Sequence, residues 1–287
     1  MKRYRVVHTS EYRFSEPVSD CRLGARLRPK KTPYQWCSFF QIVSRPPADA
    51  QRETMDAFSN HISHLYFHQS LQRLTLSSNS TVTVDAQTKM DVERSSLWSE
   101  VTRLLHREHE VRKWIEPTEL TQAEPMVTEY SRSLFSAKDT IVAAARALMH
   151  RIHSDMTFVA GATDVATPAA RVLQKRQGVC QDFTHLALAC LRSVGLPARY
   201  VSGYLNTSAF RCNSHRIASD ASHAWFSVCD PRLGWVDFDP TNNRMADDNY
   251  ITVAWGRDYA DVSPVTGTFE GPEEHDLEVW VDVQEEI

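Results

Sequence analysis

The stretch that decides the fold covers residues 178–204 and reads GVCQDFTHLALACLRSVGLPARYVSGY. Apolar residues recur in it at helical spacing from Phe183 onward, until Gly195 ends the pattern. This apolar stripe consists of Phe183, Leu186, Ala187, Cys190, Leu191 and Val194. The sequence therefore predicts a helix that begins close to Cys180 and is followed at once by a strand over residues 198–205.

A hairpin with its turn centred near Arg232 is predicted further along the chain. In this register residue 225 pairs with residue 239. His223 and Asp239 then lie on one face as diagonal neighbours, with backbones roughly 7–8 Å apart and side chains within reach of each other. Asp237 shares the face but lies further from His223, so Asp239 is the better acid to orient the imidazole.

The N-terminal part of the chain is rich in strand patterns. Apolar residues alternate with arginines over residues 22–28, which is typical of a half-buried strand. Several such short strands with turn signals between them predict a small antiparallel sheet or sandwich. From residue 126 the pattern turns helical. We therefore predict an α+β protein with a β-rich N-terminal domain over residues 1–95, a linker over residues 96–125 and a second domain over residues 126–287.

The composition is that of a folded globular protein. Hydrophobic residues make up 42% of the 287 residues, which is enough to bury a core and excludes disorder as the main state. The 32 Lys and Arg residues against 36 Asp and Glu residues give a net charge of −4, so the overall charge does not favour nucleic acid or an anionic membrane surface as a partner. The sequence has no export signal, no membrane-spanning apolar run and no disulfide pattern among its six cysteines. We therefore expect a cytoplasmic protein with reduced thiols.

Cys180, His223 and Asp239 are the residue types that catalysis by a thiol nucleophile needs. The thiol needs a base that takes its proton, and the base needs an acid that holds its tautomer and orientation. Backbone N–H groups at a helix N-terminus favour a thiolate and can also hold the oxyanion of a tetrahedral intermediate. Cys190 lies inside the apolar stripe and Cys229 at a strand end, so both are interpreted as core residues. Cys180, His223 and Asp239 are therefore the candidate catalytic residues.

Several blocks of the sequence resemble the bacterial transglutaminase-like cysteine peptidases. The stretch over residues 178–204 resembles the core of that family, and the segments His223-Ala224-Trp225 and Asp239-Pro240-Thr241 match its other two core blocks. Residues 4–29 resemble the β-rich domain that precedes this core, and residues 256–264 resemble the C-terminal signature of the group. The resemblance implies a papain-like, transglutaminase-like α+β core in the second domain, in which the helix that carries the nucleophile packs on an antiparallel sheet.

The same resemblance implies the chemistry. Cys180 is then the nucleophile, His223 the general base and acid, and Asp239 the residue that orients the imidazole. The family acts on amide bonds of peptides or proteins through a thioester acyl-enzyme. Gln181 follows Cys180 where animal transglutaminases have an aromatic residue, which favours hydrolysis over amine transfer. No acidic loop has the spacing of calcium ligands, so we predict a cysteine peptidase or amidase without a metal or other cofactor.

Three alternatives remain open from the sequence. An acyltransferase would replace water with an amine in the second step. A binding module would retain the fold without catalysis, although the intact set of Cys180, His223 and Asp239 argues against it. A zinc site needs about four convergent ligands. The candidate zinc ligands lack a complete set with clear spacing; they are Cys212, His215, His61, His64 and His68. The oligomeric state is also open.

Overall fold

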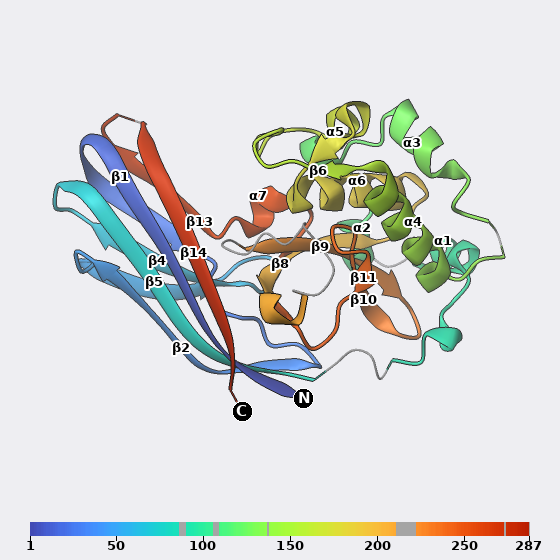
Figure 1. Cartoon of the computed structure of the whole chain (residues 1–287), viewed down its shortest axis with the longest axis horizontal. Helices are drawn as coiled ribbons and strands as arrows, with labels where there is room; N and C mark the ends of the chain where they lie inside the picture. The colour runs from blue at the N-terminus through green and yellow to red at the C-terminus, as the bar shows by residue number, and fades with distance from the viewer. Residues whose placement is uncertain (86–89, 106–108, 137, 211–221, 273, 287) are drawn as a thin grey trace.

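The computed structural model describes residues 1–85, 90–105, 109–136, 138–210, 222–272 and 274–286. Two parts lie side by side in it (Figure 1). One part is a large sheet of long strands, and the other is a smaller sheet covered by helices. The predicted mixed α+β fold is thus confirmed.

The first sheet is built around the 24-residue strand β1 (Lys2–Ala25). The main path of the sheet runs in the order β2-β5-β1-β4-β3. The other strands on this path are β2 (Gln35–Arg45), β3 (Ala50–Met55), β4 (His61–Phe67) and β5 (Leu71–Val84). Alternate side chains of β1 are buried over residues 4–10, as expected for a strand with one face on a core. The predicted antiparallel N-terminal sheet is therefore present.

The last two strands of the chain return to this first sheet. Both β13 (Val265–Glu270) and β14 (His275–Glu286) pair antiparallel with β1. Figure 1 shows β14 beside β1, although the two strands come from opposite ends of the sequence. The predicted second domain, residues 126–287, includes these two strands. The sequence does not indicate that they pair with β1, because alternation within a strand does not reveal which distant strand will pair with it. The domain boundaries near residues 95 and 125 stay predictions.

The second sheet has the strand order β11-β10-β9-β8-β12, and its neighbouring strands are antiparallel. Its strands are β8 (Ala198–Leu205), β9 (His223–Asp230), β10 (Gly234–Asp239), β11 (Arg244–Met245) and β12 (Tyr250–Gly256). Phe238 pairs with Phe226, so residue 239 follows opposite residue 225. This is the predicted register of the hairpin.

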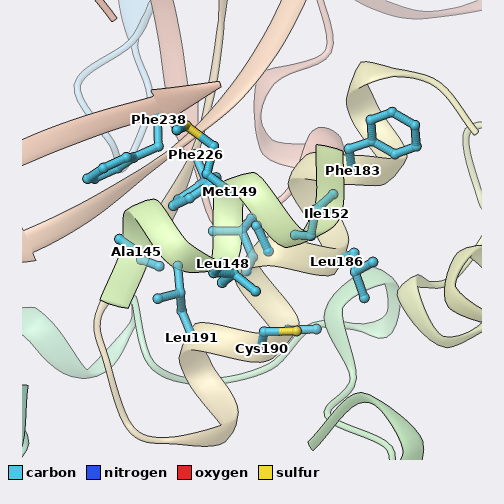
Figure 2. Close-up of a cluster of buried hydrophobic side chains, with 14 of the residues drawn as sticks. Ala145, Leu148, Met149, Ile152, Phe183, Leu186, Cys190, Leu191, Phe226 and Phe238 are labelled. Carbon is cyan, nitrogen blue, oxygen red and sulfur yellow. The ribbon is translucent and has the colours of Figure 1, made fainter. Parts of the chain in front are cut away.

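Helix α6 (Cys180–Ser193) packs on β8 and β9 and forms the centre of the helical layer. It begins at Cys180, as predicted, and all its residues except Gln181 and Ser193 are buried. The helices around it are α3 (Pro125–Arg132), α4 (Ile141–Asp155) and α5 (Ala169–Lys175). Figure 2 shows apolar side chains of α4 and α6 meeting in one cluster with Phe226 and Phe238 of the sheet. A helix buried on nearly all sides holds its first turn in a fixed place.

Short elements complete the described chain. They are η2 (Val92–Arg94), α1 (Trp98–Leu105), α2 (His109–Arg112), η3 (Glu119–Thr121), β6 (Thr157–Phe158), β7 (Gln177–Gly178), η4 (Thr207–Phe210) and α7 (Tyr259–Val262). Among the helices that the structure describes, none combines the length and the apolar character needed to cross a membrane.

Two side-chain amides hold the second sheet against the N-terminal part of the chain. Gln35 donates from Nε2 to the carbonyl of Thr252 at 2.7 Å and accepts the N–H of Thr252 at 2.8 Å. Asn60 makes the same pair of hydrogen bonds with Trp255, at 2.8 and 3.0 Å. Both partners lie on β12, the last strand of its sheet. The two amides therefore satisfy outward backbone groups of this strand, in the place of a neighbouring strand.

Candidate active site

Cys180 is presented by a tight turn between β7 and α6. Asp182 accepts the N–H of Val179 at 2.7 Å and the hydroxyl of Thr163 at 2.6 Å. A Cβ atom on Gly178 would lie 2.6 Å from an oxygen of Asp182, so only glycine leaves room for this carboxylate. Burial raises the pKa of Asp182, and the two hydrogen bonds oppose that shift. Asp182 therefore stabilises the start of the helix, which fixes the position of Cys180.

The Cys180 side chain lies at the edge of the core rather than inside it. Its exposed fraction is 9%, whereas Cys190 on the same helix is fully buried. Burial raises the pKa of Cys190 to about 12, so that side chain stays a thiol. Cys190 is thus the core residue that the sequence predicts, and Cys229 is half-buried against the same core. Cys180 differs from both by its place at a helix N-terminus.

His223 begins β9 and Asp239 ends β10, and both side chains are buried. Nε2 of His223 lies 2.8 Å from Oδ2 of Asp239. Because an ionised carboxylate can only accept, Nε2 carries the proton and Nδ1 of the neutral ring keeps its lone pair. The predicted diagonal pairing of these two side chains is confirmed.

The structure also brings Cys180 to His223. Nδ1 of the ring is buried without a hydrogen-bond partner among the described residues, and the Cys180 side chain lies close enough to act on the ring. Burial alone would lower the pKa of His223. The charge and hydrogen bond of Asp239, with a smaller contribution from Cys180, outweigh it and raise the pKa to about 10. The site therefore favours a protonated imidazole next to the sulfur atom.

Asp239 is held by several further donors. Its Oδ1 accepts the N–H of Thr241 at 2.8 Å, and its Oδ2 accepts the Asn242 amide at 2.7 Å and the Tyr250 hydroxyl at 2.8 Å. Burial would raise the pKa of Asp239, but the charge of His223 and these hydrogen bonds lower it. The carboxylate is therefore ionised and can hold the ring in one tautomer.

Asn242 and Tyr250 are the site residues that the sequence analysis misses. Asn242 follows Asp239 closely in a turn, so turn chemistry offers a signal for it. Tyr250 begins β12, which is separated from β10 by two strands in the sheet order. No local pattern in the sequence indicates that Tyr250 lies close to Asp239.

Trp225 belongs to the sheet core rather than to a cleft. Its side chain is fully buried, and its ring lies 6.1 Å from that of His223 and 5.3 Å from that of Tyr250, measured between centroids. The indole therefore packs behind the imidazole and limits its movement.

A metal site finds no support in the described part of the chain. There, no three His, Cys, Asp or Glu side chains come together in a way that could hold an ion. His64 and His68 each hydrogen-bond to another side chain instead. Cys212 and His215 lie outside the described residues.

A groove of about 720 Å³ is lined by residues that include Val165 and Tyr259, and both of these form a hydrogen bond with a side chain of α6. On one wall, Gln181 donates from its carboxamide to the carbonyl of Val165 at 3.0 Å. On the other wall, the N–H of Tyr259 donates to Nε2 of His185 at 3.2 Å. Gln181 directly follows Cys180, so the hydrogen bond to Val165 links the lining of the groove to the first turn of α6.

Comparison with known proteins identifies the family. Residues 128–240 match the model of the transglutaminase-like superfamily, and residues 4–83 match that of the bacterial transglutaminase-like N-terminal region. An uncharacterized protein of Mycobacterium tuberculosis is 37% identical over 303 residues, which cover 98% of this chain and 92% of the relative. The chain belongs to the transglutaminase-like superfamily.

Two further comparisons bear on the transglutaminase-like core. The crystal structure of a candidate cysteine protease from Cytophaga hutchinsonii superposes with a TM-score of 0.77 at 18% identity, over 99% of this chain and 90% of that one. At this identity the likeness shows the shared fold. A shorter match of 67 residues is 31% identical to a protein-glutamine gamma-glutamyltransferase of Pseudomonas aeruginosa. It covers 23% of this chain and 10% of that protein. The superfamily generally comprises cysteine enzymes.

Proposed function

We propose that this transglutaminase-like protein is a cysteine hydrolase, a peptidase or amidase that cleaves peptide or isopeptide bonds. One observation carries the proposal: the buried ring of His223 has Nε2 at 2.8 Å from Asp239 and the Cys180 side chain as the neighbour that acts on it. This is the arrangement in which a base can activate a thiol while an acid fixes the orientation of the base.

Before substrate binds, Nδ1 of His223 has taken the proton of the Cys180 thiol; in the first step the thiolate attacks the carbonyl carbon of the substrate. Backbone N–H groups in the first turn of α6 have no partner within the helix, so they can hold the resulting oxyanion. The ring then gives its proton to the leaving nitrogen as the C–N bond breaks. A free amine departs, and the acyl group stays on Cys180 as a thioester.

In the second step, water replaces the amine. Nδ1 of His223 removes a proton from the water, and the hydroxide attacks the thioester carbonyl. The C–S bond breaks and the carboxylic acid leaves, which restores the thiolate of Cys180 beside the protonated ring. Asp239 keeps Nε2 protonated in both steps and stabilises the imidazolium that forms in each.

The groove beside α6 supports a chain-like substrate. Its lining combines apolar side chains such as Leu120 with the charged side chains of Glu119 and Arg257. A peptide segment presents the same mixture of apolar and polar groups. We infer that this groove receives the part of the substrate that flanks the scissile bond.

A library of peptides and isopeptides screened for cleavage tests the proposal. Cys180→Ala and His223→Ala should each abolish turnover while the fold is retained. Cys37→Ala, which removes a thiol from β2 in the first sheet, is the matched control and should cleave as the wild type does. Unchanged turnover in the Cys180→Ala protein would exclude the mechanism.

Acyl transfer is the second candidate, and the short similarity to a glutamyltransferase favours keeping it. It shares the first step, but a primary amine then attacks the thioester in place of water. Adding a primary amine during turnover separates the two functions. A stable amide product means transfer, and free acid as the sole product means hydrolysis.

A further inference from the structure

A row of polar side chains crosses the second sheet on the face away from α6. Arg199 on β8, Ser227 on β9 and Asp237 on β10 are partners in the strand register. All three are buried. Their chain neighbours Tyr200 and Phe238 belong to the core under the helices, so the row itself points to the opposite face.

Arg199 is unusual in this row because its guanidinium is held by two indole rings and forms no ion pair within the described chain. Its guanidinium carbon lies 4.3 Å from the ring centroid of Trp235 and 3.8 Å from that of Trp255. Only 7% of the residue is exposed, and within the described residues Nε has no acceptor and the guanidinium forms no ion pair. Burial lowers the pKa of Arg199 to about 10, and the charge of Asp237 opposes that shift. A buried guanidinium whose Nε lacks an acceptor is costly unless an anionic group joins it.

A cavity of about 290 Å³ adjoins this guanidinium. Arg199, Asp237, Trp235 and Trp255 line it, and Tyr34 from the N-terminal part of the chain closes another side. The volume corresponds to about ten water molecules, so it has room for a ligand of similar non-hydrogen atom count. The cavity is lined partly by the exposed residues Pro33 and Gly234, which gives a small molecule a way in.

We propose that this cavity is a second ligand site that binds a free α-amino acid with an apolar side chain. The carboxylate of the amino acid pairs with the guanidinium of Arg199, whose planar edge matches two carboxylate oxygens. The ammonium group pairs with Asp237, and the side chain lies against the indoles. The negative charge of Asp237 in the same cavity disfavours a phosphate dianion.

The proposed site is separate from the catalytic residues. Trp225, which is fully buried, pairs with Val201 in the strand register and lies between the row of Arg199 and the position of His223. The inference therefore does not depend on the proposed hydrolysis, and binding can be measured in a protein that has no turnover.

Calorimetric titration of the full chain, with Cys180 blocked by iodoacetamide, tests the proposal. Leucine is compared with 4-methylpentanoate, which lacks the ammonium group, with 3-methylbutylamine, which lacks the carboxylate, and with inorganic phosphate. We expect one leucine per chain, bound at least about tenfold more tightly than either analogue or phosphate. No saturable binding of leucine or phenylalanine up to about 10 mM, or equal binding of leucine and 4-methylpentanoate, overturns the proposal.

Two variants locate the binding. Asp237→Asn should remove the preference for leucine over 4-methylpentanoate and leave the binding of the carboxylate in place. Arg199→Met should abolish both, with the thermal midpoint as the control for folding. If the Arg199 variant does not fold, the Asp237 variant still decides. A preference for leucine that survives Asp237→Asn excludes this site.

Discussion

At the scale of single residues, the carboxylate of Asp239 determines which nitrogen of the His223 ring carries the proton. The carboxylate accepts from Tyr250, Asn242 and the ring itself, and its pKa is lowered although it is buried. An acceptor that is ionised and fully hydrogen-bonded selects the ring tautomer in which Nδ1 is free to take a proton. The reactivity of Cys180 therefore depends on a residue that does not touch the substrate.

Asp239→Asn should lower kcat/KM by about a thousandfold or more, because the amide can donate to Nε2 and stabilise the wrong tautomer. The far-UV spectrum should stay that of the wild type, since asparagine keeps the size and shape of the side chain and one oxygen that accepts hydrogen bonds. Asp282→Asn, an exposed position on β14, serves as the control and should leave kcat/KM unchanged. A loss of less than about tenfold in Asp239→Asn would contradict the role given to this residue.

Alkylation of Cys180 reports on the interaction between Cys180 and His223 and needs no substrate. Because Asp239 and the sulfur raise the pKa of His223, the ring stays protonated at neutral pH and stabilises a thiolate beside it. Iodoacetamide should therefore modify Cys180 faster in the wild type than in His223→Ala at about pH 6 to 7, because only the wild type has a protonated ring beside the sulfur. Equal rates in the two proteins would contradict the ion pair.

The placement of the candidate catalytic residues could be predicted from the sequence because each depends on a local signal. The apolar stripe indicates where the helix begins, and the turn at Arg232 sets the register that brings His223 beside Asp239. Tyr250 and Arg199 could not be assigned in this way. Their surroundings come from strands that are not neighbours in sequence, and no periodicity within a strand encodes them.

At the scale of elements, the turn into α6 is the part on which the site depends most directly. Gly178, Val179 and Asp182 form a closed set in which the carboxylate occupies the space that a side chain on residue 178 would need. The sequence indicates a glycine at a sharp turn, but it does not show that the reason is the approach of Asp182. Removing either part should move the first turn of the helix and the sulfur with it.

Gly178→Ala should destabilise the protein by about 1–3 kcal/mol, because the new methyl group overlaps Asp182. The loss of kcat should be larger than the fraction of unfolded protein accounts for, since Cys180 moves relative to His223. Asp182→Ala removes the clash but also the hydrogen bond to Val179. Urea unfolding and kcat of both single variants and the double variant measure the coupling. Additive effects in this cycle would show that the two side chains act independently.

At the scale of the whole molecule, the two parts of the chain are joined by side chains that act as a strand. Gln35 and Asn60 each satisfy a backbone N–H and a backbone carbonyl of β12. The C-terminal strands β13 and β14 return to β1 and tie the end of the chain to its beginning. These long-range connections explain why the local pattern predicts the sheets but not how the ends of the chain meet.

Gln35→Met should cost about 1–3 kcal/mol, because it leaves the N–H of Thr252 without its partner and removes one of the two hydrogen bonds that its carbonyl accepts, the other coming from the N–H of Lys30. Asn60→Leu should cost a similar amount at Trp255. If both amides hold β12 against the N-terminal part as one unit, the double variant loses less than the sum of the single losses. Gln41→Met, exposed on the same strand as Gln35, is the matched control in urea unfolding. A fully additive double variant would contradict a single docking unit.

The contact between the two parts also gives the protein a dependence on pH. His8 on β1 is buried and accepts the Tyr204 hydroxyl of β8 at Nδ1, at 3.1 Å. Burial lowers the pKa of His8 to about 4 and that of His185 to about 3. An unfolded chain protonates these rings near pH 6.5, so below that pH it binds protons that the folded protein does not, and stability falls as the pH falls. His223 does not add to this loss. Its pKa is raised by folding, and its contribution is fully present below pH 6.5 and lost as the pH rises toward the folded value.

His8→Gln should therefore reduce the slope of unfolding free energy against pH between about pH 5 and 6.5. Each buried neutral ring contributes up to about 1.4 kcal/mol per pH unit in this window, and the variant loses the contribution of one such ring while His185 keeps its own. The expected result is a slope shallower than that of the wild type by up to about 1.4 kcal/mol per pH unit, from urea unfolding at several pH values. His150→Gln, an exposed position on α4, controls for the loss of a histidine as such. Equal slopes in His8→Gln and the wild type would mean that the ring between the two parts is protonated in the folded protein, and that the hydrogen bond from Tyr204 does not set its state.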